Sequence, residues 1–573
     1  MAETLLSPGV LARENDQSFI QGQPLNVGAA IIGPAVKGPV EIPTLVGSFS
    51  EYTNIFGGAV QSGSSVYSYL TSIAANNYFQ NGGTSLLVTR VTSGSFSPAT
   101  SSLIPTGSGG PTDGLSPFVL GTISEGEIMN NTGAETSGAL VSGSTDNVRW
   151  EIPTVNTASG TFSLLIRRGD DNNVQKVVLE SYNNLSLDPY ASNYISKVIG
   201  DTTFNLNVAE NYIQQTGSYG NISKYVRVQQ VNYNTPKYFD NNGIAKPAFT
   251  GSLPAVSSGS FGSAVGSNIP TKAGGAKFYN DISAADSQGL TGSDYNNAIA
   301  LLSNVDEYKY NVISVPGLLA STHATQTTAV VNNTIARGDS IAIIDLVAYG
   351  SQINSVISQA SGFDSSYAAA YWPWLQTIDP NIGEAVFVPA STMLPGVYAF
   401  TDASSDPWFA PAGITRGALG QVIRAERKLT ASNRDDLYEA NVNPIATFPG
   451  SGVTVFGQKT LQKRASALDR VNVRRLLIAL KSFIGQVAEG LVFEQNTAAT
   501  RNNFLSQVNP YLESVQQRQG LYAFKVVMDE TNNTADVVDR NELVGQIFLQ
   551  PTRTAEFIVL DFNVLPTGAV FPA

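Results

Sequence analysis

The sequence predicts a multidomain protein of mixed α/β and α+β class. Short β-branched strands alternate with helices near the N-terminus and again after residue 294. A long segment rich in Gly, Ser and Thr lies between these stretches, and a long amphipathic helix with strand-like runs closes the chain. A chain of 573 residues is also too long for one core, so we expect roughly three or four domains.

The alternation of strands and helices defines the first domain. Apolar runs of strand length occupy residues 27–32, 86–91, 312–315, 341–347 and 385–388. Helical spacing occupies residues 64–79, 295–303, 324–336 and 351–360. This pattern is typical of βαβ units and a mainly parallel sheet. We therefore assign residues 24–92 and 294–424 to one α/β middle domain, split by an insertion.

The insertion, residues 93–293, is expected to form one or two β-rich outer domains on the surface. Its clearest element is a hairpin: Phe162, Leu164 and Ile166 alternate with polar residues, and residues 174–179 return the chain. The turn between them, residues 169–173, has oxygen ligands that could bind calcium. No Glu follows at the EF-hand spacing, so a plain turn is favoured.

The C-terminal region, residues 425–573, is expected to begin with helices. Ser466 starts a motif that resembles a capping box, and an apolar stripe continues at helical spacing over residues 473–491. Asn509-Pro510 is suited to opening a second helix, which Gly520 would end.

Both ends of the chain are suited to pairing with another subunit. Residues 1–23 lack apolar periodicity, and Pro8, Gly9 and Val10 indicate an extended arm, which has no core of its own. At the other end, strands are expected at residues 521–528, 543–549 and 556–564. One face of the last strand is wholly apolar and has to be covered: Ile558, Leu560, Phe562 and Val564.

The composition excludes several classes of protein. Charged residues make up 14% of the chain and the net charge is −12, which argues against a nucleic-acid binder because such proteins need a basic footprint. The absence of cysteine excludes a disulfide scaffold. The first residues lack the features of a secretory signal and no long apolar run predicts a membrane span, so we expect a protein made in a cytoplasm.

Catalytic motifs are missing from the sequence. His323 is the one histidine, so sites that need two are excluded. The chain has no G-x-S-x-G elbow, no Gly-Lys dipeptide for a phosphate-binding loop, and no G-x-G-x-x-G after a strand. The carboxylate pairs Asp435-Asp436 and Asp529-Glu530 are interpreted as exposed surface residues. We therefore expect neither an enzyme nor a cofactor.

One basic cluster stands out from the acidic chain. Between residues 459 and 481 the only acid is Asp469, and the basic residues are Lys459, Lys463, Arg464, Arg470, Arg474, Arg475 and Lys481. A solvated helix face is one interpretation, and a contact surface for an acidic protein partner is the other. Nucleic acid is disfavoured because no aromatic residues are interleaved with these charges.

A series of specific motifs lies in order along the chain. Residues 468–476 read L-D-R-V-N-V-R-R-L, residues 526–534 read V-V-M-D-E-T-N-N-T, and residues 538–542 read V-D-R-N-E. Further motifs are Leu5 to Val10, Phe56-Gly57-Gly58, Ala410 to Gly413 with Arg416-Gly417, and Asn443-Pro444-Ile445. With these motifs the chain resembles the contractile-tail sheath proteins of myophages. The resemblance is dense over 405–570, good over 1–92 and thin across the insertion.

The resemblance implies a mechanism. Such subunits form rings of six that stack helically around a rigid tail tube, and an inner domain combines the N-terminal arm with the C-terminal region. Terminal arms pair with sheets of neighbouring subunits, and the polymer shortens to drive the tube through the host envelope. The implied place is the virion tail, assembled in the host cytoplasm, with tube, baseplate and tail terminator proteins as partners, and without nucleic acid or membrane insertion. In this scheme the residues expected to face the tube are Arg470, Arg474, Arg475, Lys463 and Lys481.

Three alternatives stay open. A sheath from a non-phage contractile injection system shares the same logic, and the neighbouring genes would distinguish it. The Ser/Thr/Gly-rich insertion also suits an adhesin or fibre module, which specific glycan binding would support. An enzyme would require turnover that is lost when His323 or a carboxylate pair is changed.

Overall fold

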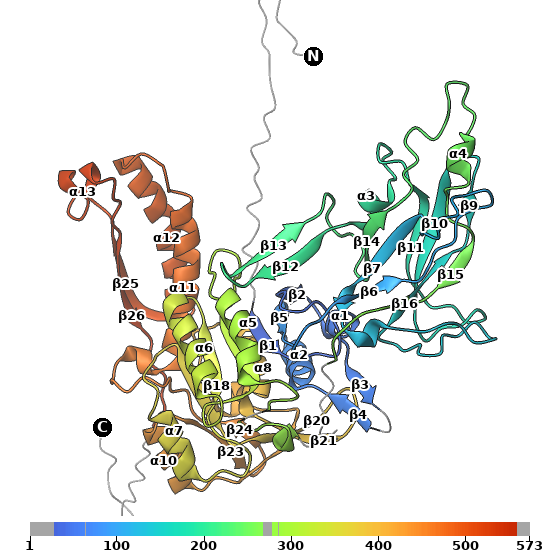
Figure 1. Cartoon of the computed structure of the whole chain (residues 1–573). Helices are drawn as coiled ribbons and strands as arrows, with labels where there is room; N and C mark the ends of the chain where they lie inside the picture. The colour runs from blue at the N-terminus through green and yellow to red at the C-terminus, as the bar shows by residue number, and fades with distance from the viewer. Residues whose placement is uncertain (1–27, 63–64, 268–277, 285, 558–573) are drawn as a thin grey trace, which may run out of the picture.

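A largely parallel eight-stranded sheet forms the centre of the computed structural model, which describes residues 28–62, 65–267, 278–284 and 286–557 (Figure 1). The strand order is β2-β5-β1-β17-β18-β19-β23-β24, and the two outermost strands run antiparallel to their neighbours. The bounds are β1 Ala29–Gly33, β2 Thr44–Val46, β5 Leu86–Arg90, β17 Val312–Leu319, β18 Ile341–Asp345, β19 Ala368–Trp372, β23 Asn443–Phe448 and β24 Gly452–Val455.

Helices cover both faces of this sheet, which explains why its parallel strands read as unbroken apolar runs. β1 pairs with β5 on one side and with β17 on the other, so the segments before and after the insertion share one core. One face carries α1 Phe49–Phe56, α2 Leu70–Gln80 and α8 Ala390–Ser404. The other carries α5 Asn296–Leu301, α6 Ala324–Arg337, α7 Ile353–Ala360 and α10 Ala431–Glu439.

Three expectations about this region were wrong. The helix expected at 64–79 begins only at Leu70, because Ser65–Ser68 form β4 in a hairpin with β3 Ala59–Ser62. The run Ala385–Val388, β21, lies outside the parallel sheet and pairs antiparallel with β20 Leu375–Ile378, next to β22 Val422–Ala425. The central sheet also extends past residue 424, because the buried strand β23 pairs with β19.

The insertion forms two antiparallel sheets around a core of its own. The expected hairpin is confirmed as β10–β11. Its turn holds Asp171 in a buried ion pair with Arg167 at 2.7 Å, so this carboxylate stabilises the turn. The bounds are β6 Pro98–Ser101, β7 Phe118–Glu125, β8 Val148–Ile152, β9 Val155–Asn156, β10 Thr161–Arg168, β11 Val178–Ser186, α3 Ile195–Ile199, β14 Val226–Val231, α4 Pro247–Thr250, β15 Ser257–Gly259 and β16 Phe261–Gly262.

The C-terminal lobe packs two long helices against a hairpin. It contains α11 Val471–Glu489, α12 Ala498–Gln517, β25 Leu521–Val527, α13 Ala535–Asp539 and β26 Gln546–Pro551. The prediction that Pro510 opens a helix was wrong: Thr497 caps α12, and Pro510 lies inside it. Phe504, Val508 and Leu512 on the same helix are buried in the core of the lobe, and this burial outweighs the roughly 3 kcal/mol cost of an internal proline.

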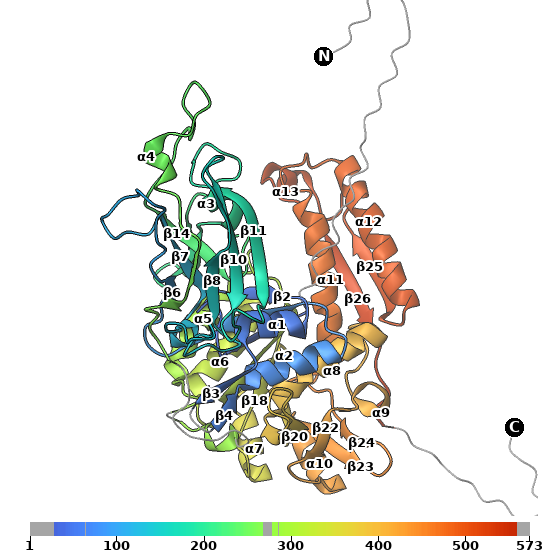
Figure 2. The same cartoon turned by 90° about the vertical axis from the view of Figure 1, so that its right-hand side faces the viewer.

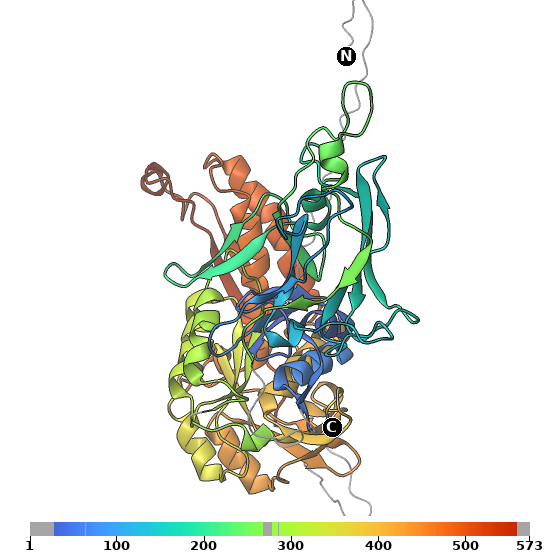
Figure 3. The same ribbon diagram turned by 45° about the vertical axis from the view of Figure 1, so that its right-hand side comes forward.

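The molecule has three lobes. The insertion and the C-terminal lobe rise on opposite sides of the central α/β body (Figures 1 and 2). The hairpin β12 Thr203–Asn207 and β13 Tyr212–Thr216 reaches from the insertion toward the body (Figure 3). Leu206 and Ile213 of this hairpin pack against the core of the body, so the insertion is braced at a second point. Within the described ranges, no helix is long and apolar enough to cross a membrane.

Candidate interaction surface

Among the described residues of the C-terminal lobe, the hairpin β25–β26 forms a sheet of two strands. Phe524 pairs with Leu549 and Val526 with Ile547, and these four side chains pack toward α12. Within the described part of the chain the sheet has only these two strands, so both outer edges lack a partner strand. Unpaired edges template the addition of another strand, because their N–H and C=O groups are free to pair.

The outer face of this hairpin is also partly apolar. Tyr522 is 65% exposed and Phe548 is 57% exposed. Exposed aromatic residues beside a free edge offer contact area to an added strand. The hairpin therefore has the geometry of a site that accepts an extended peptide.

The basic motif at the start of α11 attaches this helix to the central body. Arg475 is buried, and its Nη2 donates to both carboxylate oxygens of Asp402 on α8, at 2.7 and 2.6 Å. Its guanidinium carbon also lies 4.7 Å from the centre of the Tyr398 ring. These contacts join the C-terminal lobe to the helix that covers the central sheet.

Arg474 is buried in the same way. Its guanidinium lies 3.9 Å from the centre of the Tyr367 ring and donates to the hydroxyl of Ser366. Burial lowers the pKa of Arg474, although the neighbouring Tyr367 opposes the shift. The guanidiniums of Arg474 and Arg475 are therefore committed to contacts inside the subunit.

The sequence could not reveal these contacts. The helical spacing of the basic residues is equally typical of a solvated flank, and their partners Tyr367, Tyr398 and Asp402 lie far away in the chain. A buried arginine needs a carboxylate or an aromatic face, but nothing local identifies which one.

The remaining residues of the basic cluster are more accessible. Arg470 is half-buried and pairs with Asp469 at 3.0 Å and Glu556 at 2.7 Å. Lys463 and Lys481 are exposed, with Nζ atoms 2.8 Å from the Ser361 carbonyl oxygen and 3.3 Å from the Tyr367 hydroxyl. The side chains of both lysines thus lie at the surface of the subunit. The predicted arm residues lie outside the described residues: Pro8, Gly9, Val10, Ile558, Leu560, Phe562 and Val564.

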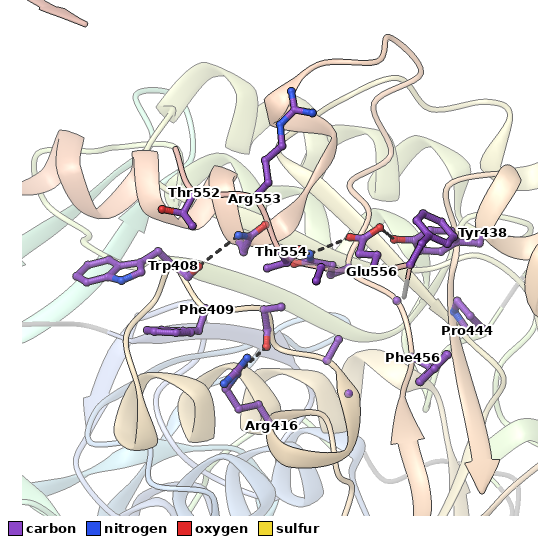
Figure 4. Close-up of a pocket in the computed structure, with 18 of the residues that line it drawn as sticks. Trp408, Phe409, Arg416, Tyr438, Pro444, Phe456, Thr552, Arg553, Thr554 and Glu556 are labelled. Atoms are coloured by element: carbon purple, nitrogen blue, oxygen red, sulfur yellow. Dashed lines mark hydrogen bonds between the residues drawn. The ribbon is translucent and has the colours of Figure 1, made fainter. Parts of the chain in front are cut away.

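A cavity of about 600 Å³ lies where the chain leaves β26 (Figure 4). Its walls include Trp408, Phe409 and Phe456 from the body, and residues 552–557 cross it. Glu556 accepts hydrogen bonds there from Tyr438 Oη at 2.8 Å and from Gln458 Nε2 at 2.9 Å, in addition to Arg470. Burial alone would raise the pKa of Glu556, but these donors hold it below the ordinary value.

The single histidine has a structural position. His323 is 3% exposed at the start of α6, and its Nδ1 lies 2.9 Å from the Thr322 hydroxyl oxygen. Burial lowers its pKa. In the described residues, no three His, Cys, Asp or Glu side chains gather in a way that could hold a metal ion.

The fold and this surface define a three-lobed α/β protein in which, over the described residues, the C-terminal lobe carries an open sheet edge. Two sequence-family models match the chain: the phage tail sheath protein central domain over residues 288–461 and the phage tail sheath C-terminal domain over residues 464–564. Residues 288–461 and 464–564 of this chain are thus similar to the two domains of phage tail sheath proteins.

Curated relatives support the same assignment. The chain is 42% identical over 185 residues to the tail sheath protein of Vibrio phage KVP40, covering 32% of this chain and 28% of that protein. It is 35% identical over 230 residues to the tail sheath protein of Enterobacteria phage T4, covering 40% of this chain and 35% of that protein. The chain thus spans about a third of the length of these relatives.

Two solved structures share the fold across nearly the whole chain. The contracted helical sheath of the anti-feeding prophage has a TM-score of 0.51 at 16% identity, covering 97% of this chain and 98% of that one. The sheath tail protein from Listeria innocua has a TM-score of 0.52 at 10% identity, covering 92% of this chain and 95% of that one. The chain therefore shares its overall fold with these two proteins.

Proposed function

We propose that the protein is the structural subunit of a contractile phage tail sheath. It polymerises as stacked rings of six around the tail tube and contracts to drive the tube through the host envelope. The observation that carries the proposal is the hairpin β25–β26. Among the described residues both of its edges are unpaired, and it lies in the region that matches the phage tail sheath C-terminal domain. A terminal segment of a second copy pairs with such an edge through directional backbone hydrogen bonds.

A contact between subunits that does not close into a ring generates a helical polymer. Rotation of the subunits about the paired arms changes the length of this polymer. Energy for the stroke is stored at assembly, in an extended state held by a kinetic barrier. The polymer belongs to the virion tail and is assembled in the host cytoplasm, with the tube, baseplate and tail terminator proteins as further partners.

The tube-facing role falls to Lys463 and Lys481. Lys481 is exposed on α11 and Lys463 is exposed in the segment before this helix, whereas Arg474 and Arg475 are buried. A pair of surface cations attracts an acidic partner chiefly by steering its approach.

Negative-stain electron microscopy tests the proposal. The purified protein, with and without its tube protein, should form hollow cylinders or tube-bound sleeves with six-fold helical order. Monomers or small closed oligomers under all conditions would contradict it. A sheath of a non-phage injection system is the second candidate, because the anti-feeding prophage sheath shares the fold; capsid and portal genes beside this gene would decide for the phage.

A further inference from the structure

The segment from Thr552 to Phe557, called here the exit segment, crosses open space after β26 ends. Cavities of about 600 and 500 Å³ both include Arg553, Thr554, Ala555 and Glu556 in their walls. Phe557 is 82% exposed, and Arg553 points away from the other labelled residues in Figure 4. Apolar burial therefore contributes little to holding this segment in place.

Polar contacts hold it instead. The backbone N–H of Thr552 donates to the Gly520 carbonyl oxygen at 3.2 Å, which continues the hairpin by one residue. Beyond that point, the described side-chain contacts of the exit segment are those of Thr554, which accepts from Gln458, and of Glu556. Hydrogen bonds to an ionised carboxylate are about twice as strong as neutral ones, so Glu556 is the main attachment.

The three donors to Glu556 come from separate elements. Tyr438 lies on α10, Gln458 follows β24, and Arg470 directly precedes α11. Arg470 is itself fixed by Asp469 and lies 5.9 Å from the centre of the Tyr438 ring. One carboxylate thus joins the exit segment to the junction between the central body and the C-terminal lobe.

We propose that Glu556 is a positioning residue that sets the register in which the C-terminal segment reaches a second copy of this chain. This inference rests on the proposed sheath function. Beyond Glu556 the positions Ile558, Leu560, Phe562 and Val564 are all apolar, whereas Asp561 and Asn563 are polar. A slip of one residue in a paired strand turns every side chain to the opposite face. A fixed point two residues before Ile558 prevents that slip.

The first test uses the unassembled subunit and a natural protease site. Trypsin cleavage after Arg553 releases Thr554–Ala573 as one peptide, because no Lys or Arg follows. In Glu556→Ala we expect release about tenfold faster than in the wild type, since local opening controls cleavage. Glu556→Gln keeps an acceptor but loses the charge, so its rate should lie between the two. Glu542→Ala removes an exposed carboxylate paired with Arg540 at 3.1 Å and should not change release.

Two results would overturn the inference in this assay. Unchanged release in Glu556→Ala would show that the carboxylate does not hold the exit segment. Equal acceleration at every tryptic site would show that Glu556 supports the fold as a whole and has no specific positioning role.

The second test reads register directly. The chain has no cysteine, so a cysteine replacing Phe562 can be paired with single cysteines placed along β25 and β26 without background. Disulfides form only where Cα atoms approach within about 7 Å, so the wild-type polymer should cross-link at one dominant position and the Glu556→Ala polymer at several. A single unchanged position in Glu556→Ala would refute positioning and leave the sheath function intact, whereas failure of the wild type to polymerise would refute the sheath function itself.

Discussion

Replacing Arg475 with Ala tests how the C-terminal lobe is attached to the body. The change removes two charge-assisted hydrogen bonds to Asp402 and the contact with the Tyr398 ring. Asp402 keeps 30% of its side chain exposed, so its lost partner is partly replaced by water. We expect the free energy of opening α11 from the body to fall by about 3 kcal/mol. This sum combines hydrogen bonds to charged groups with a ring contact of about 1 kcal/mol.

Hydrogen exchange of the unassembled subunit measures this loss locally. If α11 opens as a unit, about 3 kcal/mol lowers the protection of its amides roughly a hundredfold. Arg518→Ala is the matched control. Arg518 pairs with Asp406 at 2.7 Å and lies 4.8 Å from the centre of the Trp408 ring, but 48% of its side chain is exposed. Arg518→Ala should lower the same free energy of opening by less than about 1 kcal/mol. Equal effects of the two changes, or unchanged protection of α11 in Arg475→Ala, would refute this account of the motif.

Three further predictions address assembly and pH. Replacing Lys463 and Lys481 with Glu should weaken tube-templated assembly, most strongly at low salt, and leave tube-free polymerisation unchanged; equal loss in both assays would contradict a tube-facing role. Deleting residues 558–573 should leave a folded subunit, by thermal melting, that no longer forms polymers in the electron microscope; unfolding or normal polymers would count against strand exchange. Burial raises the pKa of Asp345 to about 7, although hydrogen bonds from Ser391 oppose the shift. The folded state therefore binds the extra proton, and stability should fall by up to about 4 kcal/mol as pH rises from 4 to 7. Asp345→Asn should flatten this profile in urea unfolding measured across that range, and an unchanged slope would exclude Asp345 as its source.

Local periodicity made much of the fold predictable. The apolar stripe at 473–491 gave α11, and alternation around Phe162 to Ile166 gave the β10–β11 hairpin. Both patterns repeat within the element they describe, so no distant information is needed. The split of the central sheet could be predicted as well. Its buried strands read as short apolar runs on each side of the insertion.

Features that depend on distant partners could not be predicted in this way. Pro510 satisfies a local rule for opening a helix, but burial of α12 against the hairpin decides the outcome. Arg474 and Arg475 carry the charge of a surface patch, and only the folded chain places Tyr367 and Asp402 against them. The attachment of Glu556 likewise joins residues from three elements, so no spacing in the sequence identifies it.

The most direct test of the central claim is a helical cryo-EM reconstruction of the assembled polymer. Strand exchange between subunits predicts a hexameric lattice in which β25–β26 gains at least one strand from a neighbouring subunit. A polymer in which this hairpin keeps only its own two strands would contradict strand exchange as the basis of assembly.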